Sequence, residues 1–178
     1  MRNLWPLLMA GSIGAMGVQT AMAENVELLV GSYTAGQSQG IYRLAFDSAT
    51  GQINPKPLQV INSENPSWLT LSKDQQRLFV VNENGPGQTD PVGRVSSFAI
   101  DPKSHELSLI NQVQSLGNEP THSSLSADSR HLFVSNYSVS EDPGGTLAVL
   151  PVTADGKLQP VVEMGSHPSS RVNAERQM

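Results

Sequence analysis

The chain has 178 residues, with 11 Lys and Arg against 16 Asp and Glu, and its formal net charge is −5. This balance gives no electrostatic basis for binding nucleic acid, because phosphate backbones are held by clustered Lys and Arg. The absence of Cys excludes disulfides, thiolate metal sites and a cysteine nucleophile. The 38% of hydrophobic residues can form a core, but 12 Pro and 15 Gly are too frequent for long helices.

The first 23 residues have the layout of a secretory signal peptide. A basic start at Arg2 precedes an apolar run from Leu4 to Val18, and Ala21-Met22-Ala23 matches an A-x-A cleavage site. The run is short and rich in small residues for a membrane span, which makes an uncleaved anchor the weaker alternative. We therefore expect a mature protein that starts at Glu24, is periplasmic or secreted, and has no membrane association after cleavage.

The rest of the chain is built from repeats. The segment from Asn65 to Asn82 recurs, 54 residues later, as the segment from Glu119 to Asn136. The identical pairs are Pro66/Pro120, Leu71/Leu125, Ser72/Ser126, Asp74/Asp128, Leu78/Leu132, Phe79/Phe133, Val80/Val134 and Asn82/Asn136. A second apolar unit occurs at 40–47, 93–101 and 145–152, and a polar turn follows each copy. Self-similarity at such a period is typical of repeat architectures.

The repeated units are predicted to be β-strands. They are short, rich in Val, Ile, Leu and Phe, and bounded by Asp, Gly, Asn, Ser and Pro. Side chains in residues 94–100 alternate with a period of two, as on a strand. Four antiparallel strands in about 50 residues indicate one blade of a β-propeller.

The strand count predicts an incomplete ring. Strands are expected at 26–33, 41–46 and 58–61 in a first blade, with full blades in 66–113 and 120–163. A propeller closes with about 4 to 8 blades. We therefore expect an all-β partial propeller of about three blades in residues 24–163, and the start of a linker to a fourth blade in 164–178. The uncovered face of the third blade, with Leu147, Val149 and Leu150 as candidates, is expected to permit self-association.

Seven motifs in chain order carry a family resemblance: Leu29–Thr34, Gly40–Tyr42, Pro66–Leu69, Phe79–Glu83, Pro120–His122, Leu132–Tyr137 and Val149–Val152. They resemble the bacterial 6-phosphogluconolactonase family of seven-bladed propellers, which includes carboxymuconate cyclases. The resemblance implies hydrolysis of a sugar lactone, above all 6-phosphogluconolactone to 6-phosphogluconate, in carbohydrate metabolism. In that family the segment like 172–177 continues into a Pro-His-x-His motif. Because Met178 follows here, we expect this chain alone to be weak or inactive.

The candidate site residues are those that differ where the repeat framework is otherwise kept. Trp68 and His122 occupy one slot, two residues after the repeated Pro, and Glu83 and Tyr137 occupy another, directly after the repeated Asn. The first strand of a propeller blade lines the central channel. We therefore expect these slots near a channel mouth, where loops from several blades can meet a ligand.

Each candidate has a catalytic or binding role and a structural alternative. His122 could be the general base for water attack on a lactone carbonyl, because imidazole titrates near neutral pH. Alternatively, His122 bonds the backbone of a neighbouring blade. Glu83 could bind a sugar hydroxyl or orient His122, and is otherwise a solvated loop acid. Trp68 and Tyr137 are further candidates for substrate binding.

A phosphorylated substrate requires a cation, and Arg171 and Arg176 are the candidates, with a flexible basic tail as the alternative. No Gly-rich phosphate loop, His-x-x-x-His pair or acidic calcium loop occurs in the sequence, so no cofactor or metal is expected. The expected partner is a small-molecule sugar lactone. Two further hypotheses stay open: an exported, non-catalytic propeller that binds protein or glycan, and a truncated product without a folded function.

Overall fold

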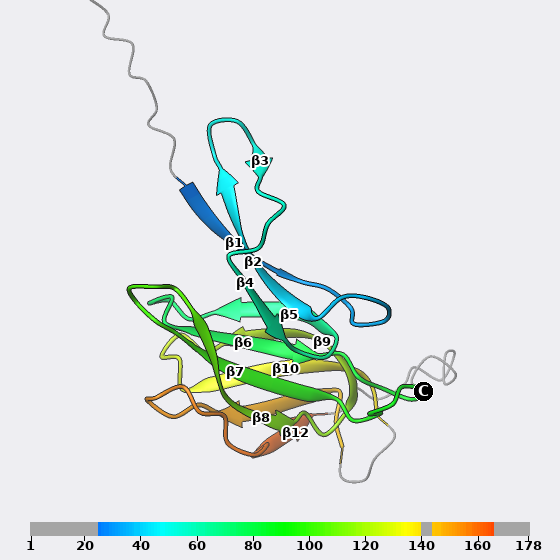
Figure 1. Cartoon of the computed structure of the whole chain (residues 1–178). Helices are drawn as coiled ribbons and strands as arrows, with labels where there is room; N and C mark the ends of the chain where they lie inside the picture. Colours follow the sequence, from blue (N-terminus) through cyan, green and yellow to red (C-terminus); the bar gives the residue numbers. More distant parts are fainter. Residues whose placement is uncertain (1–24, 140–143, 166–178) are drawn as a thin grey trace, which may run out of the picture.

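The computed structural model describes residues 25–139 and 144–165, which form three four-stranded antiparallel sheets (Figure 1). Sheet 1 contains β1 (Asn25–Gly31), β2 (Gly40–Asp47), β3 (Gln52–Ile53) and β4 (Gln59–Asn62). Sheet 2 contains β5 (Pro66–Leu71), β6 (Arg77–Asn82), β7 (Arg94–Ile100) and β8 (Leu107–Gln114). Sheet 3 contains β9 (Asn118–Leu125), β10 (His131–Ser138), β11 (Leu147–Pro151) and β12 (Glu163–Gly165). The prediction of antiparallel, four-stranded all-β units is confirmed. The predicted signal peptide and the start of the linker lie outside the described residues, apart from residues 164 and 165.

Sheets 2 and 3 follow the simple order in which each strand pairs with the next along the chain. Sheet 1 differs, because β2 pairs with β1 on one edge and with both β3 and β4 on the other. The two-residue strand β3, which follows the turn after Asp47, was not predicted. Among the described residues, β1 therefore has a pairing partner on one edge only.

Two strand predictions were wrong in detail. A strand was expected at 158–162, but Val152 and Leu158 form an isolated bridge and the fourth strand is β12 at 163–165. Pro160 lies in the intervening segment and has no N–H to donate to a ladder. The regular alternation expected in 94–100 is also interrupted, because β7 has a register shift between Ser97 and Phe98 and all four residues 95–98 are buried.

The core lies in two layers on opposite faces of sheet 2. Alternate side chains of β6 point to opposite faces of the sheet, as strand geometry requires. Phe79 and Val81 pack with residues of sheet 3, whereas Leu78 and Val80 pack with residues next to sheet 1. The layer against sheet 3 contains Phe79, Val81, Val95, Leu132, Val134, Ala148, Leu150 and Leu158; the other contains Ile41, Leu78, Val80, Phe98 and Leu107. The three sheets are therefore stacked face to face, with sheet 2 in the middle.

The outward face of sheet 3 is apolar, but Leu150 is not part of it. Leu150 is fully buried against sheet 2, because it alternates with Val149 along β11, so its prediction as an outer residue was wrong. Phe133 and Leu147 are 37% and 36% exposed. Phe133 pairs with Val149 across the ladder, which places both side chains on that same face.

We predict that replacing Phe133 and Leu147 together with Ser reduces self-association of the purified chain. The change removes apolar surface of the kind that drives association and leaves the buried face of β10 and β11 unaltered. Light scattering after size exclusion, at increasing concentration, measures the effect. The matched control is Leu109→Ser, which removes an exposed leucine of β8 in sheet 2. An unchanged mass distribution in the double variant would refute this role of the face.

Three turns are closed by the same side-chain hydrogen bond. The hydroxyl of Ser72 donates to Asp74 Oδ1 at 2.6 Å, and that of Ser126 donates to Asp128 Oδ1 at 2.6 Å. Thr153 donates to Asp155 in the third turn. These hydroxyl donors, followed for the first two by backbone N–H groups, lower the pKa of each carboxyl below its ordinary value. The repeated Ser-x-Asp motif is therefore a turn motif stabilised by an ionised carboxylate.

We predict that the double variant Asp74→Asn/Asp128→Asn is less stable than wild type at neutral pH, and that the difference shrinks in acid. A carboxyl with a lowered pKa in the folded state stabilises fully above the ordinary aspartate pKa of about 3.9, and its contribution is lost as the pH falls below it. Urea unfolding at a series of pH values measures the difference. Glu163→Gln, at a carboxylate without a hydrogen bond in the described chain, is the control. A pH-independent difference would contradict the prediction.

Candidate functional site

Trp68 and His122 follow equivalent β-bulges in the first strands of sheets 2 and 3. In β5 a register shift leaves Ser67 unpaired directly before Trp68, and in β9 it leaves Thr121 unpaired directly before His122. A bulge bends its strand and re-aims the next side chain, and bulges are common beside active sites. The repeated Pro-containing segment thus gives Trp68 and His122 the same local structure.

The structure brings these two side chains together. The ring centroids of Trp68 and His122 are 4.5 Å apart, with the planes tilted by 49°. Trp68 is 41% exposed, and its Nε1 donates to the carbonyl oxygen of Ser123 at 3.0 Å. His122 is exposed, and within residues 25–139 and 144–165 its imidazole makes no hydrogen bond.

The bond from Trp68 to Ser123 bears on the structural alternative for His122. Trp68 lies in sheet 2 and bonds the backbone of the first strand of sheet 3. By the repeat, His122 occupies the same position on sheet 3, and in β9 it pairs with Ser135, on the face that sheet 2 does not cover. A base role and a bond to a further blade are thus both compatible with the place of His122.

Glu83 hydrogen-bonds Tyr33 rather than His122. The Tyr33 hydroxyl, on the loop after β1, donates to Glu83 Oε2 at 2.8 Å, and the Glu83 N–H donates to the Asn65 carbonyl at 2.9 Å. The hydrogen bond to Glu83 raises the pKa of Tyr33, and burial and the negative charges of Glu83 and Glu119 raise it further. This interaction joins sheet 1 to sheet 2 at one end of the stack.

Glu119 is a second carboxylate at this end and was missed by the sequence analysis. Its backbone has φ 54° directly before Pro120, and Asn65, at the same position of the repeat, has φ 41°. Asn tolerates this left-handed region, whereas a residue such as Glu adopts it at a cost of about 1 kcal/mol. The Glu119 side chain covers Gly85, where an added Cβ would lie 2.4 Å from Glu119 Cγ. Comparing the two residues before the repeated Pro would have found it.

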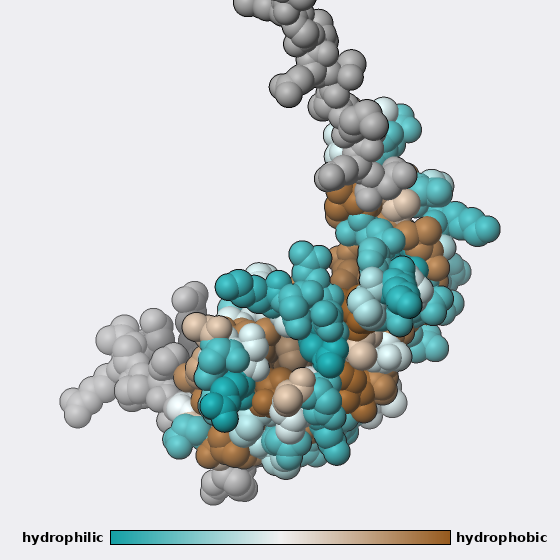
Figure 2. All heavy atoms as spheres, turned by 90° about the vertical axis from the view of Figure 1, so that its left-hand side faces the viewer, coloured by the Kyte–Doolittle hydropathy of each residue, from teal (hydrophilic) through white to brown (hydrophobic). Residues whose placement is uncertain are grey.

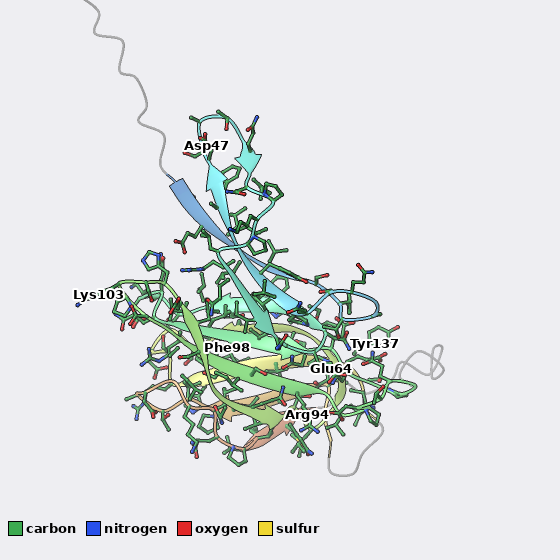
Figure 3. All side chains as sticks on the ribbon, in the orientation of Figure 1. Asp47, Glu64, Arg94, Phe98, Lys103 and Tyr137 are labelled. Carbon is green, nitrogen blue, oxygen red and sulfur yellow. The ribbon has the colours of Figure 1, made fainter. Side chains whose placement is uncertain are left out.

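We call the group of Tyr33, Glu83 and Glu119 the acidic end of the stack. Tyr137 follows Asn136 on β10 and is 70% exposed. Figure 3 shows Tyr137 and Glu64 at the right-hand end of the sheets, with Lys103 at the opposite end. Within the described chain the Tyr137 hydroxyl makes no hydrogen bond. Arg171 and Arg176 lie outside the described residues.

Two hollows flank β5. One, of about 460 Å³, runs between β5 and β9, and its lining residues are Trp68, Leu69, Thr70, Leu71, Lys73, Ser123, Ser124, Leu125, Ser126, Ala127 and Ser129. The other, of about 710 Å³, lies between sheets 1 and 2 and contains none of the predicted site residues. Figure 2 shows hydrophobic atoms at the junction of these two sheets. Because it contains Trp68, the β5–β9 hollow is the one that belongs to the candidate site.

The larger hollow is occupied at one wall by an ion-paired arginine. Arg43 Nη1 donates to Glu27 Oε2 at 3.1 Å and to the Ser104 carbonyl at 2.7 Å. His105 Nδ1 lies 3.4 Å from the same Glu27 oxygen. Cations and carboxylates both line this hollow, so its charge favours no particular ligand.

One catalytic pattern in the sequence has only a structural role. Residues 36–40 read Gly-Gln-Ser-Gln-Gly, which has the spacing of a G-x-S-x-G nucleophile elbow. That elbow requires a strand followed by a helix, whereas this segment joins the antiparallel strands β1 and β2. Ser38 Oγ accepts from the Gly40 N–H at 3.2 Å, which makes it a loop residue.

Within the described ranges, no three His, Asp or Glu side chains are grouped in a way that could hold a metal ion. No helix in those ranges has the length and apolar character needed to span a membrane.

The model of the family described as "Lactonase, 7-bladed beta-propeller" matches residues 27–178. The chain belongs to this lactonase family. It is 30% identical over 138 residues to the 6-phosphogluconolactonase of Bacillus subtilis, covering 78% of this chain and 36% of that protein. Over 139 residues it is 31% identical to the 6-phosphogluconolactonase of Formosa agariphila, covering 76% and 36%.

Solved structures agree with this membership. The periplasmic gluconolactonase PpgL of Pseudomonas aeruginosa superposes with a TM-score of 0.75 at 52% identity, covering 83% of this chain and 40% of that one. A putative 6-phosphogluconolactonase of Bacteroides uniformis gives a TM-score of 0.69 at 33% identity, covering 85% and 41%. The three sheets are therefore part of a lactonase propeller, and the chain spans about two fifths of the length of these relatives.

We predict that Glu83→Gln lowers the pKa of Tyr33 toward the ordinary tyrosine value of about 10, because it removes the negative acceptor of the Tyr33 hydroxyl. Ultraviolet titration of the phenolates in wild type and Glu83→Gln, each with and without Tyr33→Phe, isolates Tyr33 from the other two tyrosines. Glu64→Gln is the control, since its side chain makes no bond to Tyr33. A Tyr33 transition that does not move in Glu83→Gln would contradict the assigned hydrogen bond.

Proposed function

We propose that the chain is the N-terminal part of an exported enzyme that hydrolyses a sugar lactone, 6-phosphogluconolactone in particular, to the corresponding acid. The observation that carries the proposal is the likeness, at 52% identity, to a protein named as a periplasmic gluconolactonase. The names of the two curated relatives, both 6-phosphogluconolactonases, support the phosphorylated substrate. The layout of residues 1–23 and the name of PpgL support the periplasm as the location.

The proposed reaction needs a base, an oxyanion site and groups that hold the sugar. Water adds to the lactone carbonyl while His122 removes its proton, and donors stabilise the oxyanion that forms. The ester C–O bond then breaks, and the proton passes from His122 to the departing ring oxygen. Glu83 at the acidic end accepts hydrogen bonds from sugar hydroxyls, and Trp68 and Tyr137 contact the sugar. Arg171 and Arg176 remain proposed phosphate ligands.

His122→Asn tests the base against the structural alternative. Asn keeps a side-chain donor that can bond a neighbouring backbone, but it cannot accept the proton of water. If His122 is the base, the enzymatic rate falls by about 100-fold or more, and the free energy of unfolding changes little. Acid release from the lactone, corrected for its spontaneous hydrolysis, measures the rate.

His131→Asn is the matched control, because this histidine begins β10 and lies outside the site. If His122→Asn keeps the rate and His122→Ala loses stability, the histidine is a blade contact and the assignment of the base is wrong. If purified wild-type protein does not exceed the spontaneous rate, the proposed activity of this chain fails.

A further inference from the structure

The hollow between β5 and β9 has the lining of a site for an anionic sugar. Its volume of about 460 Å³ lies within the range of about 300–1,000 Å³ that small-molecule sites occupy. Five of its lining residues carry hydroxyls: Thr70, Ser123, Ser124, Ser126 and Ser129. Lys73 is the one charged residue among the lining residues, and no carboxylate is among them. This is a local positive site on a chain with a net charge of −5.

The Lys73 ammonium is available to a ligand. Lys73 is exposed and forms no ion pair within the described part of the chain. The adjacent Asp74 does not line this hollow, and its carboxylate already accepts from the Ser72 hydroxyl and the Gln76 N–H. The positive charge therefore has no partner in the groove.

Trp68 supplies a fixed aromatic surface at the other end of the same groove. Its indole is held by the bond from Nε1 to the Ser123 carbonyl, and 41% of the residue stays exposed. An anchored aromatic ring that presents a free surface suits the C–H face of a sugar ring, which is apolar. The hydroxyls of Ser124 and Ser129 have no hydrogen-bond partner in the described chain, so they can bind the hydroxyls of a sugar.

Charge fixes the direction of such a ligand. Glu83 and Glu119 both contribute negative charge at the acidic end, where they raise the pKa of Tyr33. A phosphate group is repelled from that end and attracted toward Lys73, five residues beyond Trp68 along the chain. The sugar ring then lies on Trp68, next to His122, with its anionic end toward Lys73.

We infer that Lys73 determines specificity for a phosphorylated sugar by binding its phosphate in the β5–β9 groove. The inference rests on the proposed function in that the ligand is the sugar lactone or its acid. Lys73 contacts neither the carbonyl nor the base, so it acts on substrate affinity and not on the hydrolysis step.

The test uses the two product acids, 6-phosphogluconate and gluconate, because they bind without turnover. Calorimetric titration of the whole chain should give at least about fivefold tighter binding of 6-phosphogluconate, the size of one exposed ion pair. Lys73→Gln should remove this preference and leave gluconate affinity unchanged, and Lys73→Arg should keep it. Lys103→Gln, at the opposite end from Tyr137 in Figure 3, is the control and should match wild type.

Trp68 gives a second readout. In a Trp5→Phe background Trp68 is the one remaining indole, and either acid should change its fluorescence. Equal affinity for the two acids in wild type, a preference that survives Lys73→Gln, or no binding of either acid would each overturn the inference. Lys73-dependent binding without lactone hydrolysis would uphold the inference and refute the proposed function. Hydrolysis with no effect of Lys73 on affinity would do the reverse.

Discussion

The burial of both faces of β6 is the constraint on which the rest of the structure depends. Leu78 and Val80 lie in one core layer and Phe79 and Val81 in the other, so a single six-residue strand contributes to both core layers. Large apolar side chains on successive positions cannot alternate with polar ones, and sheet 2 must therefore be covered on both sides. The stacking of sheets 1 and 3 on sheet 2 satisfies this requirement and sets where their loops meet.

The site follows from that stacking together with the repeat. Equivalent bulges in β5 and β9 turn Trp68 and His122 out of their strands, and the contact of the two sheets brings the rings to 4.5 Å. The same stacking brings Tyr33 of sheet 1 to Glu83 of sheet 2. Acidic groups at one end and a lone cation in the neighbouring groove give the surface a charge gradient along the direction of β5.

Much of the fold could be predicted from the sequence, because the 54-residue repeat marks equivalent strands and Ser-x-Asp marks their turns. The repeat could not predict the face of Leu150, since a one-residue difference in phase exchanges the two faces of a strand. Nor could it predict the bond from Tyr33 to Glu83, because these residues lie 50 positions apart and meet only through sheet stacking. Glu119 was within reach of the repeat, but its left-handed backbone is visible only in three dimensions.

The middle position of sheet 2 also has a consequence for local unfolding. Stacked units of this kind are stabilised by their own strands and by the interfaces with their immediate neighbours. Within the described chain sheet 2 has two such interfaces, whereas sheets 1 and 3 have one each. Fluctuations that open a single sheet should then be rarest in sheet 2, so amide hydrogens of β6 and β7 should exchange more slowly than those of β1. Trp68, on the strand beside β6, sits on the most persistent part of the molecule, and Tyr33 sits on the part that opens first.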